Sequence, residues 1–232
     1  MPLLRESHTE LIDLLELTVP LSEIEISKRL RAAYQPGRII TTDGYAESTF
    51  LKDGSELKCA AVLIPLVRKD SGWHMIFTHR TDTVESHKGQ VSFPGGGCND
   101  NETQAEQTAL REAQEEIGLD PHDVQILGRL NEVATITHYR VTPVVGVIPW
   151  PYKFHLSRNE VSRVFSIPLN WIAQSSNWDE FEFTPEGTER AFPVITYHAY
   201  DGEVLWGASA RIAQNFLEVL GMVNRQVDAT GK

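Results

Sequence analysis

The chain has 232 residues and a formal net charge of −11, from 32 acidic and 21 basic side chains. This length suits one α/β domain with additions or two small domains. The negative charge argues against a nucleic-acid-binding surface, which needs a clustered basic face. Two cysteines, Cys59 and Cys98, are too few for a disulfide framework or a zinc cluster. We therefore expect reduced thiols, as is usual in the cytosol.

No segment approaches the roughly 20 apolar residues that a membrane-spanning helix needs. The first residues, MPLLRESHTE, lack the basic start and continuous apolar run of a secretory signal. We therefore expect a cytoplasmic protein that does not associate with a membrane.

The first predicted elements are helical. Apolar residues recur at helical spacing over residues 1–34, and Pro20 divides them into two segments. Ser22 with Glu25 three residues later predicts the start of the second helix. We expect residues 1–56 to form a helical extension with connecting loops. Packing on the main domain and packing on a second copy of the chain, which would give a homodimer, both stay open.

A mixed pattern of strands and helices follows over residues 57–223, before a polar tail at 224–232. The apolar run of residues 58–67 predicts a buried strand with a hairpin partner at 73–78. A mid-chain helix is predicted from about Thr103 to Ile117, ending at Gly118. The other predicted elements are strands at 90–93, 124–132 and 141–149, a short strand or turn within 160–171, a hairpin of 191–200 with 204–206 around Asp201-Gly202, and a closing helix at 208–223. This order favours an α/β fold with a mixed sheet between helices.

The end of the mid-chain helix carries the strongest chemical signal. Glu112, Glu115 and Glu116 stand at i, i+3 and i+4, so a helix presents their carboxylates on one face. Such like charges are unfavourable together unless a cation neutralises them, and carboxylate oxygens are the ligands that Mg²⁺ and Mn²⁺ prefer. The alternative is a solvated acidic face. The neighbouring glycines and Arg111 favour the metal site.

This stretch resembles the Nudix box, which reads Gly, five residues, Glu, seven residues, then Arg-Glu-apolar-x-Glu-Glu-x-Gly-apolar. The second half matches at Arg111, Glu112, Ala113, Glu115, Glu116, Gly118 and Leu119. Glu102 is the natural equivalent of the first Glu, with one extra residue between it and Arg111, which leaves its role open. The resemblance implies a Nudix-type α/β/α sandwich and a pyrophosphohydrolase.

The segment before the box resembles the second motif of the coenzyme A pyrophosphatase branch of that family. Thr78, Arg80, Gly89 and residues 93–96 match in register. Two positions depart: Thr81 replaces a small Ser or Ala, and Glu85 replaces a basic residue. The resemblance implies substrate contacts from Arg80, Lys88, Gly89, Gly95 and Gly96.

The implied reaction is hydrolysis of the pyrophosphate bond of coenzyme A or acyl-coenzyme A, giving adenosine 3′,5′-bisphosphate and 4′-phosphopantetheine or its acyl form. Mg²⁺ or Mn²⁺ would be held by Glu112, Glu115 and Glu116, with the backbone carbonyl of Gly95 or Gly96 as a further ligand. Arg111 would orient these carboxylates. The general base stays open between the box glutamates and a glutamate elsewhere; outside the box the candidates are Glu160, Glu180 and Glu182. The alternatives are another nucleotide diphosphate, such as ADP-ribose or a dinucleotide, and a non-catalytic nucleotide sensor.

Overall fold

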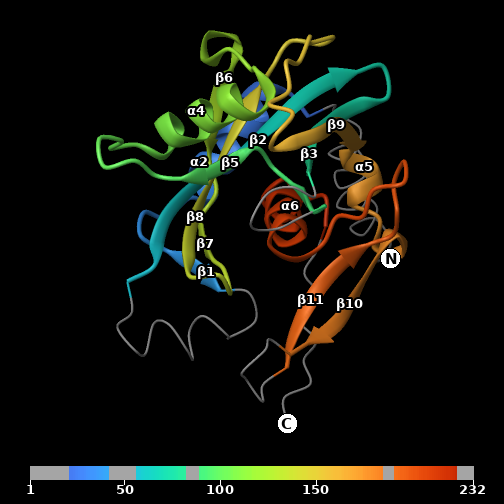
Figure 1. Cartoon of the computed structure of the whole chain (residues 1–232). Coiled ribbons are helices and arrows are strands. Elements are labelled where there is room, and N and C mark those ends of the chain that lie inside the picture. Colours follow the sequence, from blue (N-terminus) through green and yellow to red (C-terminus); the bar gives the residue numbers. More distant parts are fainter. Residues whose placement is uncertain (1–20, 42–55, 82–88, 185–190, 224–232) are drawn as a thin grey trace, which may run out of the picture.

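The computed structural model describes residues 21–41, 56–81, 89–184 and 191–223, and a nine-stranded mixed sheet forms its centre (Figure 1). Strands β2 (Lys58–Lys69) and β8 (Tyr139–Val147) pair in parallel through the middle of this sheet. β2 also pairs in antiparallel with β3 (Gly72–Arg80) and with β5 (Gly95–Gly97). The other strands are β1 (Ile39–Thr41), β4 (Val91–Ser92), β6 (Gln125–Arg129), β7 (Glu132–Ala134) and β9 (Val161–Pro168).

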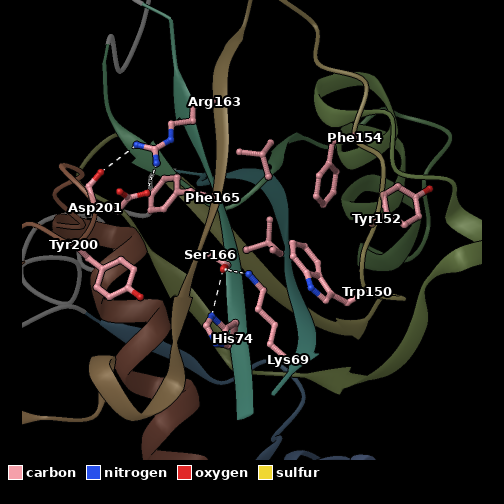
Figure 2. A pocket seen from close by; sticks show the side chains of 12 residues that line it. Lys69, His74, Trp150, Tyr152, Phe154, Arg163, Phe165, Ser166, Tyr200 and Asp201 are labelled. Carbon is pink, nitrogen blue, oxygen red and sulfur yellow. Dashed lines mark hydrogen bonds and ion pairs between the residues drawn. The ribbon is translucent and has the colours of Figure 1, made fainter. Parts of the chain in front are cut away.

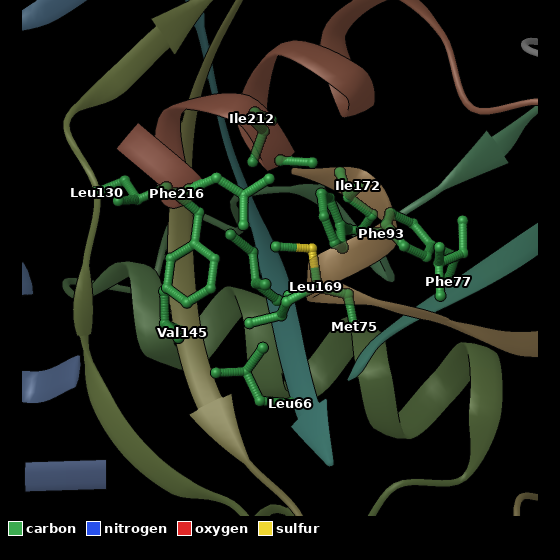
Figure 3. Close-up of a cluster of buried hydrophobic side chains, with 14 of the residues drawn as sticks. Leu66, Met75, Phe77, Phe93, Leu130, Val145, Leu169, Ile172, Ile212 and Phe216 are labelled. Carbon is green, nitrogen blue, oxygen red and sulfur yellow. The ribbon is translucent and has the colours of Figure 1, made fainter. Parts of the chain in front are cut away.

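Helices cover both faces of the sheet (Figure 1). Helix α4 (Ala105–Ile117) packs on one face, where its Ala109, Ala113 and Ile117 join sheet residues in a buried apolar cluster. On the other face, α2 (Glu23–Ala33), α5 (Leu169–Ile172) and α6 (Gly207–Val219) contribute to a second cluster, part of which Figure 3 shows. A separate two-stranded ribbon is made by β10 (Trp178–Phe183) and β11 (Phe192–Tyr197). Two single turns of 3-10 helix, η1 (Pro121–Asp123) and η2 (Ser175–Asn177), complete the elements.

The alternation along β3 explains the two clusters. Met75 and Phe77 are buried in the cluster beneath α6, whereas Ile76 between them is buried in the cluster beneath α4. Because successive side chains of a strand point to opposite faces, a strand that is apolar at every position must be covered on both sides. The predicted α/β fold with a mixed sheet is therefore confirmed.

The helix that carries the acidic residues begins two residues later than predicted. Its N-cap is Gln104, and the side chain of Gln107 accepts hydrogen bonds from the backbone N–H groups of Thr103 (2.8 Å) and Gln104 (3.0 Å). The predicted end is confirmed, since Gly118 is the C-cap in a left-handed conformation with φ of 66°.

One expectation about strands was wrong, and another was confirmed only in part. Residues 39–41, expected in a connecting loop, form β1 and pair in parallel with β7. The expected turn at Asp201-Gly202 is present, with φ of 52° and 81°. The predicted hairpin is present in part, because Thr196 forms an antiparallel bridge with Trp206 and the Tyr197 N–H donates to the Leu205 carbonyl at 2.8 Å. The main partner of β11, however, is β10.

The expectation of two reduced cysteines was also wrong. Cys59 and Cys98 form a disulfide, although 39 residues separate them in sequence. The pairing of β2 with β5 explains this proximity, because Ala60 lies opposite Gly97 and each cysteine is the next residue outward. None of the helices in the described ranges is long and apolar enough to cross a membrane.

Of the two predicted N-terminal helices, the first lies outside the described residues and the second is α2. Ser22 caps α2 as predicted, accepting a hydrogen bond from the Glu25 N–H at 3.2 Å. Ile26 and Leu30 of α2 are fully buried in the cluster beneath α6. This helix therefore packs on the main sheet of the same chain. The division at residue 57 and the homodimer stay predictions.

We expect Leu30→Ala to lower the free energy of unfolding by about 2–5 kcal/mol, because it removes a fully buried side chain and leaves a cavity. The matched control is Ile24→Ala on the same helix, where the side chain is 82% exposed and the change should stay within about 0.5 kcal/mol. Urea denaturation measures both. Equal, small effects would mean that α2 does not contribute to the stability of the domain.

Candidate metal and diphosphate site

The predicted acidic residues lie where α4 passes the glycine strand β5. Pairing with β2 holds Gly95 opposite Val62 and Gly96 opposite Ala61. A Cβ atom on Gly96 would lie 2.5 Å from the carboxylate of Glu112, so glycine lets this carboxylate lie directly against the strand. The three glycines of residues 95–97 thus form a strand against which the helix presents its carboxylates.

Glu116 is the most buried of these carboxylates, with 2% of the residue exposed. Its Oε1 accepts a hydrogen bond from Arg80 Nη1 at 3.0 Å, and its Oε2 accepts one from the Gly95 N–H at 3.3 Å. Burial raises the pKa of Glu116 to about 7, because the partial compensation by Arg80 is smaller than the desolvation of the charged form. The negative charges of Glu112 and Glu160 raise this pKa further.

Glu112 shares the same poorly hydrated space. Burial raises its pKa, a hydrogen bond from Arg111 opposes that change, and the charges of Glu115 and Glu160 add to it. The Glu115 side chain, by contrast, is 58% exposed. The structure therefore brings Glu112 and Glu116 together and leaves Glu115 at the solvent edge of the predicted set.

Arg111 connects the helix to the loop before it. Its Nε donates to Glu102 Oε1 at 2.7 Å, its Nη1 donates to Glu112 (2.7 Å) and Glu115 (3.1 Å), and its Nη2 donates to the Gly97 carbonyl (2.9 Å). One guanidinium thus contacts two carboxylates of the predicted metal set and the strand beside them. This geometry supports the orienting role that the resemblance implies.

Glu102, whose role the sequence left open, is the main partner of Arg111. It also accepts hydrogen bonds from the Asn99 N–H (2.8 Å) and the Thr108 hydroxyl (2.7 Å). The hydrogen bond from Arg111 is the largest cause of the lowering of the Glu102 pKa to about 2. Glu102 is therefore a permanently charged group that holds Arg111 and the start of α4 in place.

Glu160 lies close enough to the cluster for its charge to act on Glu112 and Glu116. Its carbonyl accepts a hydrogen bond from the Thr81 N–H, immediately after Arg80, and its own N–H donates to Ser157, both at 2.9 Å. Ser157 in turn donates its N–H to the Glu116 carbonyl at 2.9 Å, which joins this turn to α4. Of the three candidate bases outside the box, Glu160 alone raises the pKa values of Glu112 and Glu116; Glu180 and Glu182 lie on the β10–β11 ribbon.

The structure brings only some of the predicted substrate-binding residues together. Arg80, Gly95 and Gly96 meet at Glu116 and Glu112. Gly89 has a positive φ of 63° and precedes Gln90, whose carbonyl accepts the Arg80 N–H at 3.0 Å. Lys88 and the departing Glu85 lie outside the described residues.

The donor chemistry of this site fits a hard divalent cation. The converging carboxylates raise one another's pKa values, which marks a concentration of negative charge that a cation would neutralise. Among the described residues, no three acidic, histidine or cysteine side chains are arranged to bind a metal ion as they stand. Arg80 and Arg111 contact carboxylate oxygens of Glu116 and Glu112 that a cation would need.

A groove of about 550 Å³ runs along the edge strand β9, and none of the predicted site residues lines it (Figure 2). Lys69 Nζ donates to Ser166 Oγ at 2.7 Å and lies 3.9 Å from the centre of the Trp150 ring. Arg163 and Asp201 form an ion pair at the other end of the groove (Figure 2). The polar groups of the groove thus contact one another, and the carboxylate cluster is a separate site.

The chain is similar in sequence to known proteins over most of its length. A family model described as the NUDIX domain matches residues 57–187. The chain is 36% identical over 163 residues to the uncharacterized Nudix hydrolase NudL of Escherichia fergusonii, covering 70% of this chain and 83% of that protein. The NudL of Escherichia coli strain K12 DH10B has the same identity and coverage. A solved structure, the Nudix hydrolase RenU from M. smegmatis, is 24% identical with a TM-score of 0.43, covering 50% of this chain and 73% of that one.

We expect Glu116→Gln to become progressively more stable than the original protein as pH rises from about 5 to about 8 in the presence of a chelator. The folded-state pKa of Glu116, about 7, lies above its ordinary value of 4.5. The original protein therefore loses stability as pH rises through this window, whereas glutamine does not titrate. At about 1.4 kcal/mol per pH unit, the relative gain is on the order of 3 kcal/mol.

The matched control for this experiment is Glu115→Gln, because Glu115 lies on the same helix but is largely exposed. Its free energy of unfolding should follow that of the original protein across the pH range. Parallel curves for Glu116→Gln and the original protein would show that Glu116 is not held in a poorly hydrated environment.

Proposed function

The chain belongs to the Nudix family of pyrophosphohydrolases, and we propose that its substrate is coenzyme A or an acyl-coenzyme A. Members of the family act on small nucleotide substrates with divalent metal ions. The proposal of a coenzyme A substrate rests on two observations. The segment before the box resembles the coenzyme A branch, and Arg80 of this segment contacts the box residue Glu116 at 3.0 Å. This contact supports a single site that both motifs build.

Arg80 has the chemistry to bind a diphosphate. The planar guanidinium can donate two parallel hydrogen bonds to phosphate oxygens. Its Nη1 donates to Glu116, while its buried Nε has no hydrogen-bond partner among the described residues. A phosphate oxygen of the substrate would satisfy this donor and remove the cost of leaving it unpaired.

Glu112, Glu115 and Glu116 would hold Mg²⁺ or Mn²⁺. When bound, such ions offset the charge of the diphosphate and lower the pKa of a water molecule. Arg111 would keep Glu112 and Glu115 oriented through its bonds to Glu102 and to the Gly97 carbonyl.

In the proposed reaction a water oxygen forms a bond to one phosphorus of the diphosphate, and the bond from that phosphorus to the bridging oxygen breaks. The bridging oxygen leaves with the second phosphate, and the water proton passes to a carboxylate. We propose that Glu160 is the carboxylate that accepts this proton. Its charge acts on both Glu112 and Glu116, and no arginine or lysine of the described residues forms an ion pair with it, which leaves it free to accept a proton.

The test of the substrate is product analysis by chromatography after incubation with coenzyme A, acetyl-coenzyme A, ADP-ribose, NADH and diadenosine polyphosphates, with Mg²⁺ or Mn²⁺. We expect adenosine 3′,5′-bisphosphate from the two coenzyme A substrates, no product with chelator, and no product from Glu116→Gln. Preferred cleavage of ADP-ribose or a dinucleotide would keep the chemistry and overturn the substrate. Nucleotide binding without turnover of any compound would favour a nucleotide sensor.

We expect Glu160→Gln to lower kcat by about 10²–10⁴-fold, the usual contribution of a general base. The same variant should bind Mn²⁺ with nearly unchanged affinity, measured by electron paramagnetic resonance in the absence of substrate. Glu112→Gln is the comparison, because removal of a metal ligand should weaken Mn²⁺ binding. Equal losses of Mn²⁺ affinity in both variants would identify Glu160 as a ligand and overturn its role as base.

A further inference from the structure

We infer that Glu203 is a positioning residue for the proposed hydrolysis: together with His79 and Arg163 it holds the end of β3 so that Arg80 lies opposite Glu116. This inference rests on the proposed function, because it concerns the placement of Arg80 in that site. Glu203 lies on the α6 side of the sheet, and the sequence patterns did not single it out.

The first observation is an irregularity in the pairing of β3 with β9. His79 lies opposite Arg163 and Arg80 lies opposite Val161, so Ser162 is an extra residue on β9. The Ser162 hydroxyl donates to the His79 carbonyl at 3.0 Å. Such a bulge re-aims the side chains beside it and commonly occurs next to active sites. The direction of Arg80 therefore depends on how this bulge is held.

Glu203 holds the bulge from one face of the sheet. Its residue exposure is 7%, its Oε1 accepts a hydrogen bond from Arg163 Nη1 at 2.9 Å, and its Oε2 lies 2.8 Å from His79 Nδ1. The two partners are themselves opposite each other across β3 and β9. A single carboxylate thus joins both strands at the position where their register shifts.

The turn at Asp201-Gly202 holds Glu203 in place. Tyr200 and Glu203 exchange backbone hydrogen bonds of 2.9 and 3.0 Å around Asp201-Gly202, both of which have positive φ. Arg163 also forms an ion pair with Asp201 (Figure 2). The Asp201 side chain is 65% exposed, however, and exposed ion pairs contribute little. Replacement of Glu203, and not of Asp201, should therefore disturb the end of β3.

The next residue, Arg80, points to the opposite face of the sheet, which carries the proposed site. Successive side chains alternate between faces, so His79 contacts Glu203 on one face while Arg80 contacts Glu116 on the other. Directly after Arg80, the Thr81 N–H donates to the Glu160 carbonyl at 2.9 Å. Loosening the bulge would therefore disturb both the contact of Arg80 with Glu116 and that of Thr81 with Glu160.

The test compares Glu203→Gln with Asp201→Asn, which removes a charge from the same cluster without contacting His79. We expect Glu203→Gln to lower kcat about 10- to 100-fold, the usual effect of a misplacement of about 1 Å, and to increase amide hydrogen exchange in residues 76–81. KM should change much less than kcat. Asp201→Asn should match the original protein in kcat and in hydrogen exchange.

The readouts separate this inference from the proposed function. If the original protein cleaves coenzyme A and Glu203→Gln loses only thermal stability, with kcat and exchange at 76–81 unchanged, Glu203 merely anchors a turn and the inference is wrong. If the original protein cleaves no diphosphate, the proposed function is wrong, whatever the role of Glu203. Hydrogen exchange then still decides whether Glu203 holds the end of β3, because that measurement needs no substrate.

Discussion

The structure is organised around a concentration of negative charge. Glu112 and Glu116 share a poorly hydrated space near Glu160, and each of the two has its pKa raised by burial and by neighbouring charges. Like charges in such an environment are costly unless opposite charges compensate them. In this chain the compensation comes from two arginines on separate elements, Arg80 from β3 and Arg111 from α4 itself. Their contacts determine how the sheet and the helix meet.

The two arginines act in different ways. Arg111 lies within a fully bonded network that includes Glu102, Glu115 and a backbone carbonyl, so its position is over-determined. Arg80 has a single carboxylate partner and a buried Nε without a partner among the described residues. A guanidinium with unused donors is suited to an incoming phosphate, whereas one whose donors are all used is suited to holding ligands in place. The difference in bonding thus matches the difference between a substrate-binding group and an orienting group.

Local sequence rules predicted the parts of the site that depend on one element. The spacing of Glu112 and Glu116 on α4 and the end of that helix at Gly118 follow from helix geometry and from the left-handed cap. The other parts depend on which distant segments meet. The sequence offered Glu160 as one of three candidate bases outside the box, but its place at the site follows from the turn that ties it to Thr81. Cys98 reaches Cys59 because β5 pairs with β2. Glu203 likewise joins His79 only through the tertiary fold. Periodicity within a segment carries no information about which distant strand it will pair with, so these contacts could not be inferred from one sequence.

The glycine strand shows why two distant parts of one motif must occur together. A side chain at position 96 would overlap the carboxylate of Glu112, and one at position 95 would overlap the backbone of β2, with Cβ atoms 2.5 Å from Glu112 and from the Ala61 carbonyl. Glycine at these positions therefore allows α4 to approach the sheet closely enough for the Gly95 N–H to reach Glu116. That close approach excludes water from the carboxylates, and exclusion of water is what raises their pKa values. The glycines thus set the electrostatics of the glutamates, although they contribute no charge themselves.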